Sequence, residues 1–100
     1  MIMKDLYIFP AIFSYESDGI SIEFPDLPGC FSCAYSNYEA MQNAREAMSL
    51  YLYCSEIDNE IIPEPSNILE ISREKNQAVV FIDIFMPPVR DEMKAKHIAA

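Results

Sequence analysis

The feature that most constrains this chain is a change of hydrophobic period at Ser36. Before Ser36, apolar and polar residues tend to alternate, as in half-buried strands; after it, apolar residues recur at helical spacing. Ser36 and Glu39 also have the spacing of a capping box, in which each side chain binds a backbone amide of the first turn. We therefore predict strands first, and then a helix that begins at Ser36 and ends near Ile57.

Three segments before Ser36 predict an antiparallel meander. Residues 6–15 are rich in strand-forming residues, but Pro10 lacks a backbone N–H, which predicts a sheet edge or a bulge at that point. A polar turn at residues 17–19 leads into residues 20–24, which alternate strictly between apolar and polar. Residues 30–35 complete the meander as a third short strand.

A strongly shaped loop separates the second and third predicted strands. Its two prolines fix φ and remove donors, and its glycine permits a sharp reversal of the chain. We interpret the loop residues as structural. They are Phe24, Pro25, Asp26, Leu27, Pro28, Gly29 and Cys30.

The predicted helix has an apolar and a polar stripe. Its alanines are small enough to let it lie close to a sheet, with larger apolar residues filling the gaps around them. The core stripe comprises Ala40, Met41, Ala44, Ala47, Met48, Tyr51 and Leu52, and the stripe expected to face water comprises Gln42, Arg45, Glu46, Ser49 and Glu56.

Beyond the helix, Asn59 is a plausible left-handed cap, and residues 62–66 form an extended linker that leads to a short helical turn. Residues 78–86 are almost continuously apolar, which predicts a central strand covered on both faces. Asp83 interrupts that run, and we expect its carboxylate to face solvent or an interface.

One domain over residues 1–88 is predicted, closed by the pair Pro87-Pro88. Residues 89–100 mix charges of both signs and show no periodic apolar face, so we expect a linker or a truncated C-terminal segment.

No stretch approaches the roughly 18 apolar residues of a membrane span, and the start does not resemble a secretion signal. We expect a cytoplasmic protein.

The acidic balance of the chain favours a basic protein as partner. Sixteen Asp and Glu against seven Lys and Arg give a formal charge of −9, which repels nucleic-acid phosphates. An acidic surface can also do no more than keep a small domain soluble. Charge alone does not distinguish that role from the binding of a basic partner. The three cysteines, an odd number, predict free thiols in a reducing compartment.

The sequence offers little for catalysis or for a cofactor. Cys30 and Cys33 have C-x-x-C spacing but would point to opposite faces of a strand, and no second pair completes a metal site. His97, the only histidine, lies in the predicted tail. The carboxylate pairs Glu23 with Asp26 and Asp18 with Glu39 could hold a metal, but we favour solvated surface charge. We predict no enzyme, no metal and no cofactor.

Several motifs together resemble the HicB-like antitoxin family over residues 7–86. They are Phe9-Pro10-Ala11-Ile12-Phe13, Asp18-Gly19, the loop at residues 24–30, Glu39-Ala40 and Asn43-Ala44, followed by Ile62-Pro63-Glu64-Pro65-Ser66. The chain departs from the family at Ala34-Tyr35-Ser36, where Gly-Asp-Thr or Gly-Asp-Ser is usual. Ser36 still provides the helix N-cap, but without the glycine the sequence does not predict the backbone path of the preceding turn.

The resemblance implies an α+β fold of the partial ribonuclease-H-like kind, β-β-β-α-β, with the last strand beside the first. It implies an antitoxin that neutralises a basic, mRNA-cleaving HicA-type toxin by masking its RNA-binding surface. Family members often add a C-terminal DNA-binding segment for autoregulation. We expect Asp18, Glu23, Asp26 and Glu39 to contact the toxin, and the chain to form a dimer or a larger homo-oligomer.

Two other functions remain open at this point. A free-standing regulatory or ligand-binding module of the same fold would serve a different partner, and the neighbouring reading frame would distinguish it. A metal-dependent nuclease acting through the carboxylates is the third reading, because fold does not determine function. Titration of a divalent metal with an RNA substrate would test that reading.

Overall fold

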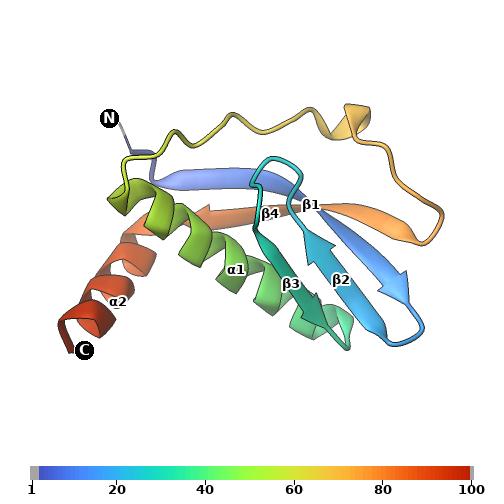
Figure 1. Cartoon of the computed structure of the whole chain (residues 1–100), viewed down its shortest axis with the longest axis horizontal. Coiled ribbons are helices and arrows are strands. Elements are labelled where there is room, and N and C mark those ends of the chain that lie inside the picture. The colour runs from blue at the N-terminus through green and yellow to red at the C-terminus, as the bar shows by residue number, and fades with distance from the viewer. Residues whose placement is uncertain (1–2, 100) are drawn as a thin grey trace.

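A computed structural model of the chain describes the backbone of residues 3–99 and the side chains of residues 3–96. It has a four-stranded antiparallel sheet, with a long helix against one face and a second helix at one end (Figure 1). The elements in chain order are β1 (Leu6–Glu16), β2 (Gly19–Glu23), β3 (Phe31–Ala34), α1 (Asn37–Ile57), the 3-10 helix η1 (Ile68–Glu70), β4 (Gln77–Phe85) and α2 (Met86–Ala99). The predicted α+β class is confirmed.

The predicted meander is confirmed by the strand order β3-β2-β1-β4. Strands β1 and β2 form a hairpin in which Glu16 pairs with Gly19. Gly19 has a φ of 146°, and a Cβ there would lie 3.0 Å from the carbonyl oxygen of Ala34, so the tight turn requires glycine. The last strand lies antiparallel beside the first, from Leu6 opposite Phe85 to Ser14 opposite Gln77.

The expectation that the last strand is central is wrong, because β4 is an edge strand. Ile82 and Ile84 face the core, whereas Phe81 and Phe85 are exposed on the other face. A continuous apolar run is typical of a strand with two covered faces. In this chain the apolar run of β4 includes Phe81 and Phe85, and no other described element covers their side chains.

Pro10 does not mark a sheet edge, since β1 has neighbours on both sides. The ladder with β2 reaches only as far as Ile12, however, so Pro10 pairs only with Phe81 of β4. On the unpaired stretch of β1, residues 63–65 of the linker lie alongside. A residue without an N–H is tolerated where no second strand needs its donor.

Helix α1 supplies much of the core. Ala40, Ala44, Met48 and Leu52 are fully buried against the sheet, as its apolar stripe predicts. Ser36 Oγ accepts from the amide of Glu39 at 3.1 Å, which confirms the N-cap. Glu39 Oε1 accepts from the amide of Tyr35 at 2.9 Å, one residue before the amide expected from the capping box.

At its other end, α1 stops with Asp58 as C-cap and with Asn59 in the left-handed region at a φ of 55°, as expected. The expectation that Glu56 faces water is wrong, because Glu56 is buried. Its carboxylate pairs with Arg90 of α2, with Nη2 to Oε2 at 2.9 Å. The burial of a carboxylate is tolerated because it is paired and hydrogen-bonded.

Residues 86–99 form a helix, although their sequence predicts a linker or a truncated segment from residue 89 onward. Pro87 and Pro88 lie in its first turn, where backbone N–H groups have no intrahelical acceptor and the fixed φ of proline suits a helix. Val89 packs against the core, and the predicted boundary at residue 88 falls inside this helix. The side chain of His97 lies outside the described residues. No helix within residues 3–99 has the length and apolarity to cross a membrane.

Candidate functional site

The structure brings two of the four predicted partner-binding acids to one end of the molecule. Asp18 lies in the turn between β1 and β2, beside Tyr15 and Tyr35. Glu39 contacts the backbone of Tyr35 from the first turn of α1. Tyr35 and Tyr38 are 83% and 73% exposed. We call Tyr15, Asp18, Tyr35, Tyr38 and Glu39 the acidic-aromatic tip.

The tyrosines of the acidic-aromatic tip are missing from the sequence-based candidates. An aromatic residue in a strand-like or helical stretch is first read as core, and only the fold shows which ones point outward. Tyr15 is held in place by its hydroxyl, which donates to Asn37 Oδ1 at 2.8 Å. Exposed tyrosines are enriched among the residues that dominate binding energy at protein interfaces.

The other two predicted acids lie at the loop that follows β2. Glu23 is exposed at the end of that strand. Asp26 is half-buried, and its carboxylate accepts from the amide of Ser66 at 2.9 Å and from the Ser66 hydroxyl. Asp26 therefore has a structural contact, because it fastens the linker to the loop.

The loop at residues 24–30 is anchored by its apolar members. Phe24, Leu27 and Cys30 are buried, and successive hydrogen bonds run from the Leu27 amide to the Phe24 carbonyl at 3.1 Å and from the Cys30 amide to the Leu27 carbonyl at 3.0 Å. Pro25 and Pro28 are exposed at the bends. Gly29 has a φ of 87°, which favours glycine.

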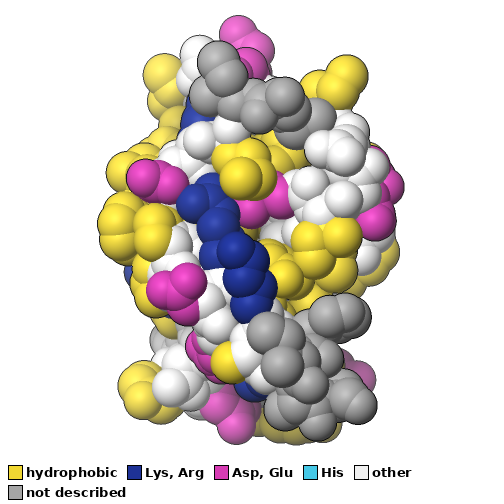
Figure 2. Space-filling model, turned by 90° about the vertical axis from the view of Figure 1, so that its left-hand side faces the viewer, with side chains coloured by type: hydrophobic (Ala, Val, Ile, Leu, Met, Phe, Trp, Pro, Cys, Tyr) yellow, Lys and Arg dark blue, Asp and Glu magenta, His cyan; other side chains and the backbone are white. Residues whose placement is uncertain are grey.

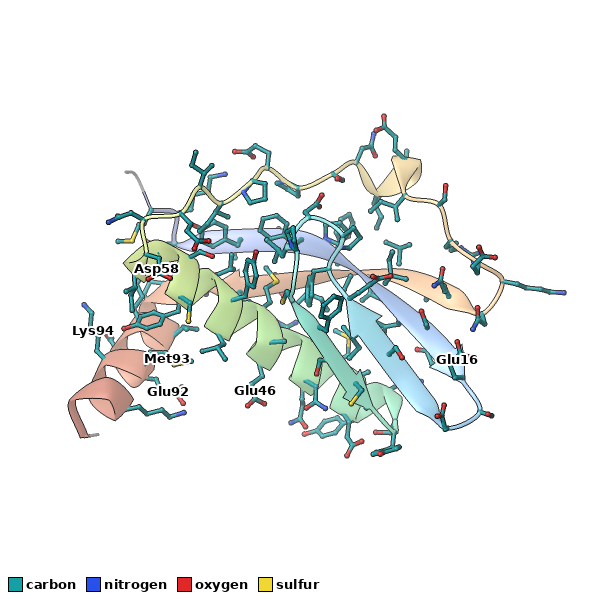
Figure 3. The ribbon with its side chains drawn as sticks, viewed as in Figure 1. Glu16, Glu46, Asp58, Glu92, Met93 and Lys94 are labelled. Atoms are coloured by element: carbon teal, nitrogen blue, oxygen red, sulfur yellow. The ribbon has the colours of Figure 1, made fainter. Side chains whose placement is uncertain are left out.

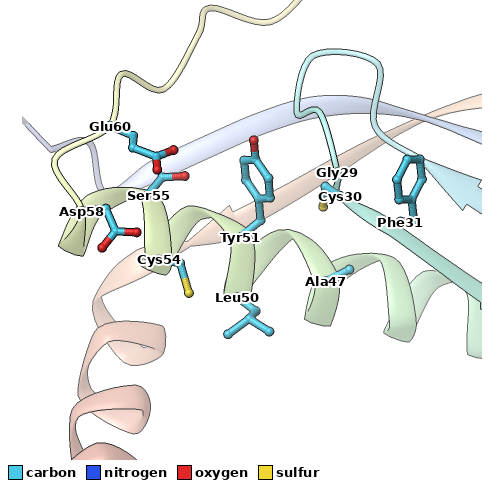
Figure 4. A pocket seen from close by; sticks show the side chains of 10 residues that line it. All are labelled: Gly29, Cys30, Phe31, Ala47, Leu50, Tyr51, Cys54, Ser55, Asp58 and Glu60. Atoms are coloured by element: carbon cyan, nitrogen blue, oxygen red, sulfur yellow. The ribbon is translucent and has the colours of Figure 1, made fainter.

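Next to this loop is a cavity of about 400 Å³ between α1 and the start of β3 (Figure 4). Phe31, Leu50 and Tyr51 give it an apolar wall, and Asp58 and Glu60 lie at one end. We call this cavity the α1–β3 groove. It was not predicted, because its two walls come from segments about twenty residues apart that only the fold brings together.

Two groups in the α1–β3 groove have shifted pKa values. Burial raises the pKa of the Cys30 thiol to about 11. Burial also raises the pKa of the Tyr51 hydroxyl, and the negative charges of the Glu60 carboxylate and of the Cys30 thiolate raise it further. Cys54 lines the same groove but is exposed. All three cysteines of the chain are free thiols.

A second apolar surface lies on the sheet face opposite α1. Leu6, Ile8, Phe81 and Phe85 are each more than two-fifths exposed there, and we call them the outer patch. A cavity of about 630 Å³ separates part of it from residues 65–68. Beside it, Arg45 reaches from α1 to β4, with Nη1 2.7 Å from Asp83 Oδ1 and 2.6 Å from the Asp83 carbonyl oxygen.

The negative charge is not uniform over the surface. Figure 2 faces the end formed by α2, the start of β1 and the end of α1, and shows a band of Lys and Arg side chains flanked by acidic and hydrophobic groups. Glu92, Met93 and Lys94 project from α2 (Figure 3). Glu92 also pairs with Lys96, with Nζ to Oε1 at 3.0 Å.

The described side chains form several exposed surfaces suited to binding. Among residues 3–96, no three His, Cys, Asp or Glu side chains gather as a metal site. The two carboxylate pairs considered from the sequence, Glu23 with Asp26 and Asp18 with Glu39, are therefore not part of such a cluster. The arrangement consists of exposed aromatic groups, an apolar cavity with acidic residues at one end, and a surplus of negative charge.

One family model matches most of the chain. The model of the HicB-like antitoxin of bacterial toxin-antitoxin systems matches residues 9–99. An uncharacterized 14.9 kDa protein in the rep-hol intergenic region of Haemophilus phage HP1 (strain HP1c1) is 31% identical over 80 residues, which are 77% of this chain and 60% of that protein. This chain therefore spans about 60% of the length of that relative.

Two solved structures share the fold. A chain of the HicA3 and HicB3 toxin-antitoxin complex superposes with a TM-score of 0.64 and 20% identity, over 76% of this chain and 95% of that one. A chain of a toxin-antitoxin complex from Streptococcus pneumoniae gives 0.71 and 15% identity, over 92% and 88%. At such identities the likeness shows the fold, and the family follows from the match over residues 9–99. This chain belongs to the HicB-like antitoxin family of bacterial toxin-antitoxin systems.

Proposed function

We propose that this chain is an antitoxin that binds a small basic ribonuclease of the HicA type and masks the surface with which that toxin holds RNA. The observation that carries the proposal is the family match over residues 9–99. In this function the chain acts in the cytoplasm by binding and not by catalysis. Its activity is the occlusion of another protein's active surface.

The charge of the chain supports this proposal. A protein that binds RNA presents positive charge, and a formal charge of −9 on this chain attracts it over distances comparable to the Debye length, about 8 Å at physiological salt. Steering of this kind raises the association rate more than it raises affinity. The exposed tyrosines of the acidic-aromatic tip would supply the close contacts that slow dissociation.

The test begins with the adjacent reading frame. Its product should be basic, should co-purify with this chain, and should cleave mRNA alone but not when this chain is in molar excess. An unrelated acidic protein of similar size and charge is the control, and it should leave cleavage unchanged. Cleavage that continues at saturating concentrations of this chain would contradict the proposal.

Two further properties belong to the same proposal. We infer that any autoregulation would act through a C-terminal DNA-binding segment, because the acidic surface described above repels DNA phosphates. We also infer that the chain self-associates into a dimer or a larger homo-oligomer through the outer patch. Contiguous exposed apolar groups on a sheet face are typical of interaction surfaces.

A further inference from the structure

The C-terminal end of α1, beside the α1–β3 groove, has an unusual charge arrangement. The end of a helix carries a partial negative charge of about half a unit, and basic residues usually lie there. The last turn of α1 contains no basic residue, and Asp58 and Glu60 are the first and third residues after the helix. The helix end therefore adds negative potential to that of the two carboxylates.

Arg90, which pairs with the last turn of α1, does not neutralise Asp58 or Glu60. Arg90 is committed to Glu56, with Nε to Oε1 at 3.0 Å, and to Asp5, with Nη1 to Oδ1 at 2.8 Å. Among the ion pairs of residues 3–96, none involves Asp58 or Glu60. The acidic end of the α1–β3 groove is thus unpaired within the described part of the chain.

The rest of the α1–β3 groove is suited to an alkyl chain. Leu50 and Phe31 are more than half exposed, and the ring of Tyr51 stands between Glu60 and Cys30 (Figure 4). Glu60 and Tyr51 line the same groove (Figure 4), and the Glu60 carboxylate raises the pKa of the Tyr51 hydroxyl. An apolar wall that ends in carboxylates complements a side chain with a long apolar stem and a cationic head.

We propose that the α1–β3 groove receives a lysine or arginine side chain of the basic partner, with its stem along Leu50 and Tyr51 and its charge between Asp58 and Glu60. The inference rests on the proposed function, because the partner is the toxin that this chain is proposed to bind. The bound lysine or arginine would give the complex one specific contact, in addition to the general attraction between an acidic and a basic protein. A charged hydrogen bond in a partly desolvated cavity contributes more than one on an open surface.

The first test uses the cysteines as reporters. Cys54 lines the α1–β3 groove, whereas Cys33 is exposed on β3 outside its lining. Iodoacetamide should modify both in the free chain. With the adjacent-gene toxin bound, we expect the rate at Cys54 to fall by about 10-fold or more while the rate at Cys33 changes little, since an occupied groove excludes the reagent. Equal protection of both, or none at Cys54, would overturn the inference.

The second test removes the two charges. The double variant Asp58→Asn with Glu60→Gln is compared with Glu70→Gln with Glu74→Gln, which loses the same charge at exposed positions outside the α1–β3 groove. We expect the groove pair to weaken toxin binding by about 30-fold and the control pair by less than about 3-fold. Folding should be preserved, because removing carboxylates from a helix C-terminus relieves repulsion.

The outcomes separate this inference from the proposed function. Equal weakening by both pairs would show that only total charge matters, and would overturn the α1–β3 groove as an anchor while leaving inhibition of the toxin intact. Wild-type chain that neither binds nor inhibits the toxin would refute the proposed function, and this inference with it.

Discussion

Arg90 ties together three distant parts of the chain. Its guanidinium binds both carboxylate oxygens of Glu56, at 3.0 and 2.9 Å, and also Asp5 Oδ1 at 2.8 Å and the carbonyl oxygen of Lys4 at 2.6 Å. The hydrogen bond with Glu56, followed by that with Asp5, raises the pKa of Arg90 above its usual value, despite the opposing effect of burial. This one side chain therefore fixes α2 to α1 and to the start of β1.

The substitution Glu56→Gln tests this contact. The Glu56 side chain is 4% exposed and that of Arg90 17%, so the variant leaves a largely buried cation without its main partner. We expect the free energy of unfolding to fall by about 3 kcal/mol, measured by urea denaturation. Glu46→Gln, at an exposed position on the same helix, should change it by less than about 0.5 kcal/mol. Equal effects of the two variants would contradict the assignment.

Cys30 should differ from the other two thiols in reactivity. Burial stabilises its neutral form and raises its pKa to about 11, from an ordinary value near 9. At pH 8 the thiolate fraction is therefore lower by about 100-fold, and Cys30 should be alkylated only after unfolding, whereas Cys33 and Cys54 react in the native protein. Peptide mapping after iodoacetamide treatment measures this. Rapid labelling of native Cys30 would contradict its burial.

The same shift gives a direction for the pH dependence of stability. The folded state prefers the protonated thiol, so the contribution of Cys30 is fully present below about pH 9 and is lost as the pH rises toward 11. The slope of unfolding free energy against pH over this window should be smaller in Cys30→Ala. An unchanged slope would argue against the shift.

At the scale of elements, Asp26 holds the linker between α1 and β4. Asp26→Ala removes the acceptor for the Ser66 amide, which lies 2.9 Å away, and for the Ser66 hydroxyl. We expect a loss of about 1–2 kcal/mol in stability and faster hydrogen exchange in residues 60–70. Asp18→Ala, in an exposed turn, is the control and should leave exchange there unchanged. Unaltered exchange in the Asp26 variant would show that the linker is held by other contacts.

Elements specified by local patterns could be predicted from the sequence, whereas those that depend on distant contacts could not. The meander and the Ser36 cap follow from alternation and capping within a few residues. The position of β4 at an edge depends on which strands pair with it, and an apolar run does not record this, because Phe81 and Phe85 stay exposed. Pro87 predicts the end of the domain, although proline also suits the first turn of a helix, where the structure has it. The sequence predicts a solvated Glu56 because its partner, Arg90, lies 34 residues further on.

The sequence predicts the chemical character of the candidate site but not the positions of its residues. Net charge and the loop motif at residues 24–30 indicated an acidic binding protein with a shaped loop. They did not show that the Asp26 carboxylate accepts hydrogen bonds from Ser66, or that the side chains of Tyr35 and Tyr38 project from the surface. Exposure of an aromatic residue is a property of the assembled fold, so the sequence alone does not separate an anchor from a core residue.

For the whole molecule, the main consequence is that α1 covers only one face of the sheet. The outer patch remains on the other face, at the β1–β4 side of the sheet. Extension of the sheet by pairing along β4 is hindered near the C-terminal end of that strand, because Arg45 donates to the carbonyl oxygen of Asp83 at 2.6 Å. We therefore expect self-association to use the exposed faces, with Phe81 and Phe85 as the contact, and not strand addition.

Light scattering on the isolated chain at increasing concentration tests this mode of association. We expect a dimer or a larger assembly in the wild type, and a monomer in the double variant Phe81→Ser with Phe85→Ser, because each substitution removes an exposed aromatic group from the outer patch. Tyr35→Ser with Tyr38→Ser removes two aromatic groups from the acidic-aromatic tip and should leave the assembly intact. A wild-type chain that stays monomeric at the highest concentration, or a loss of assembly in both variants alike, would exclude the outer patch as the self-association surface. If the tip variant then still assembles but no longer inhibits the toxin, self-association and toxin binding use separate faces, and one chain can do both at once.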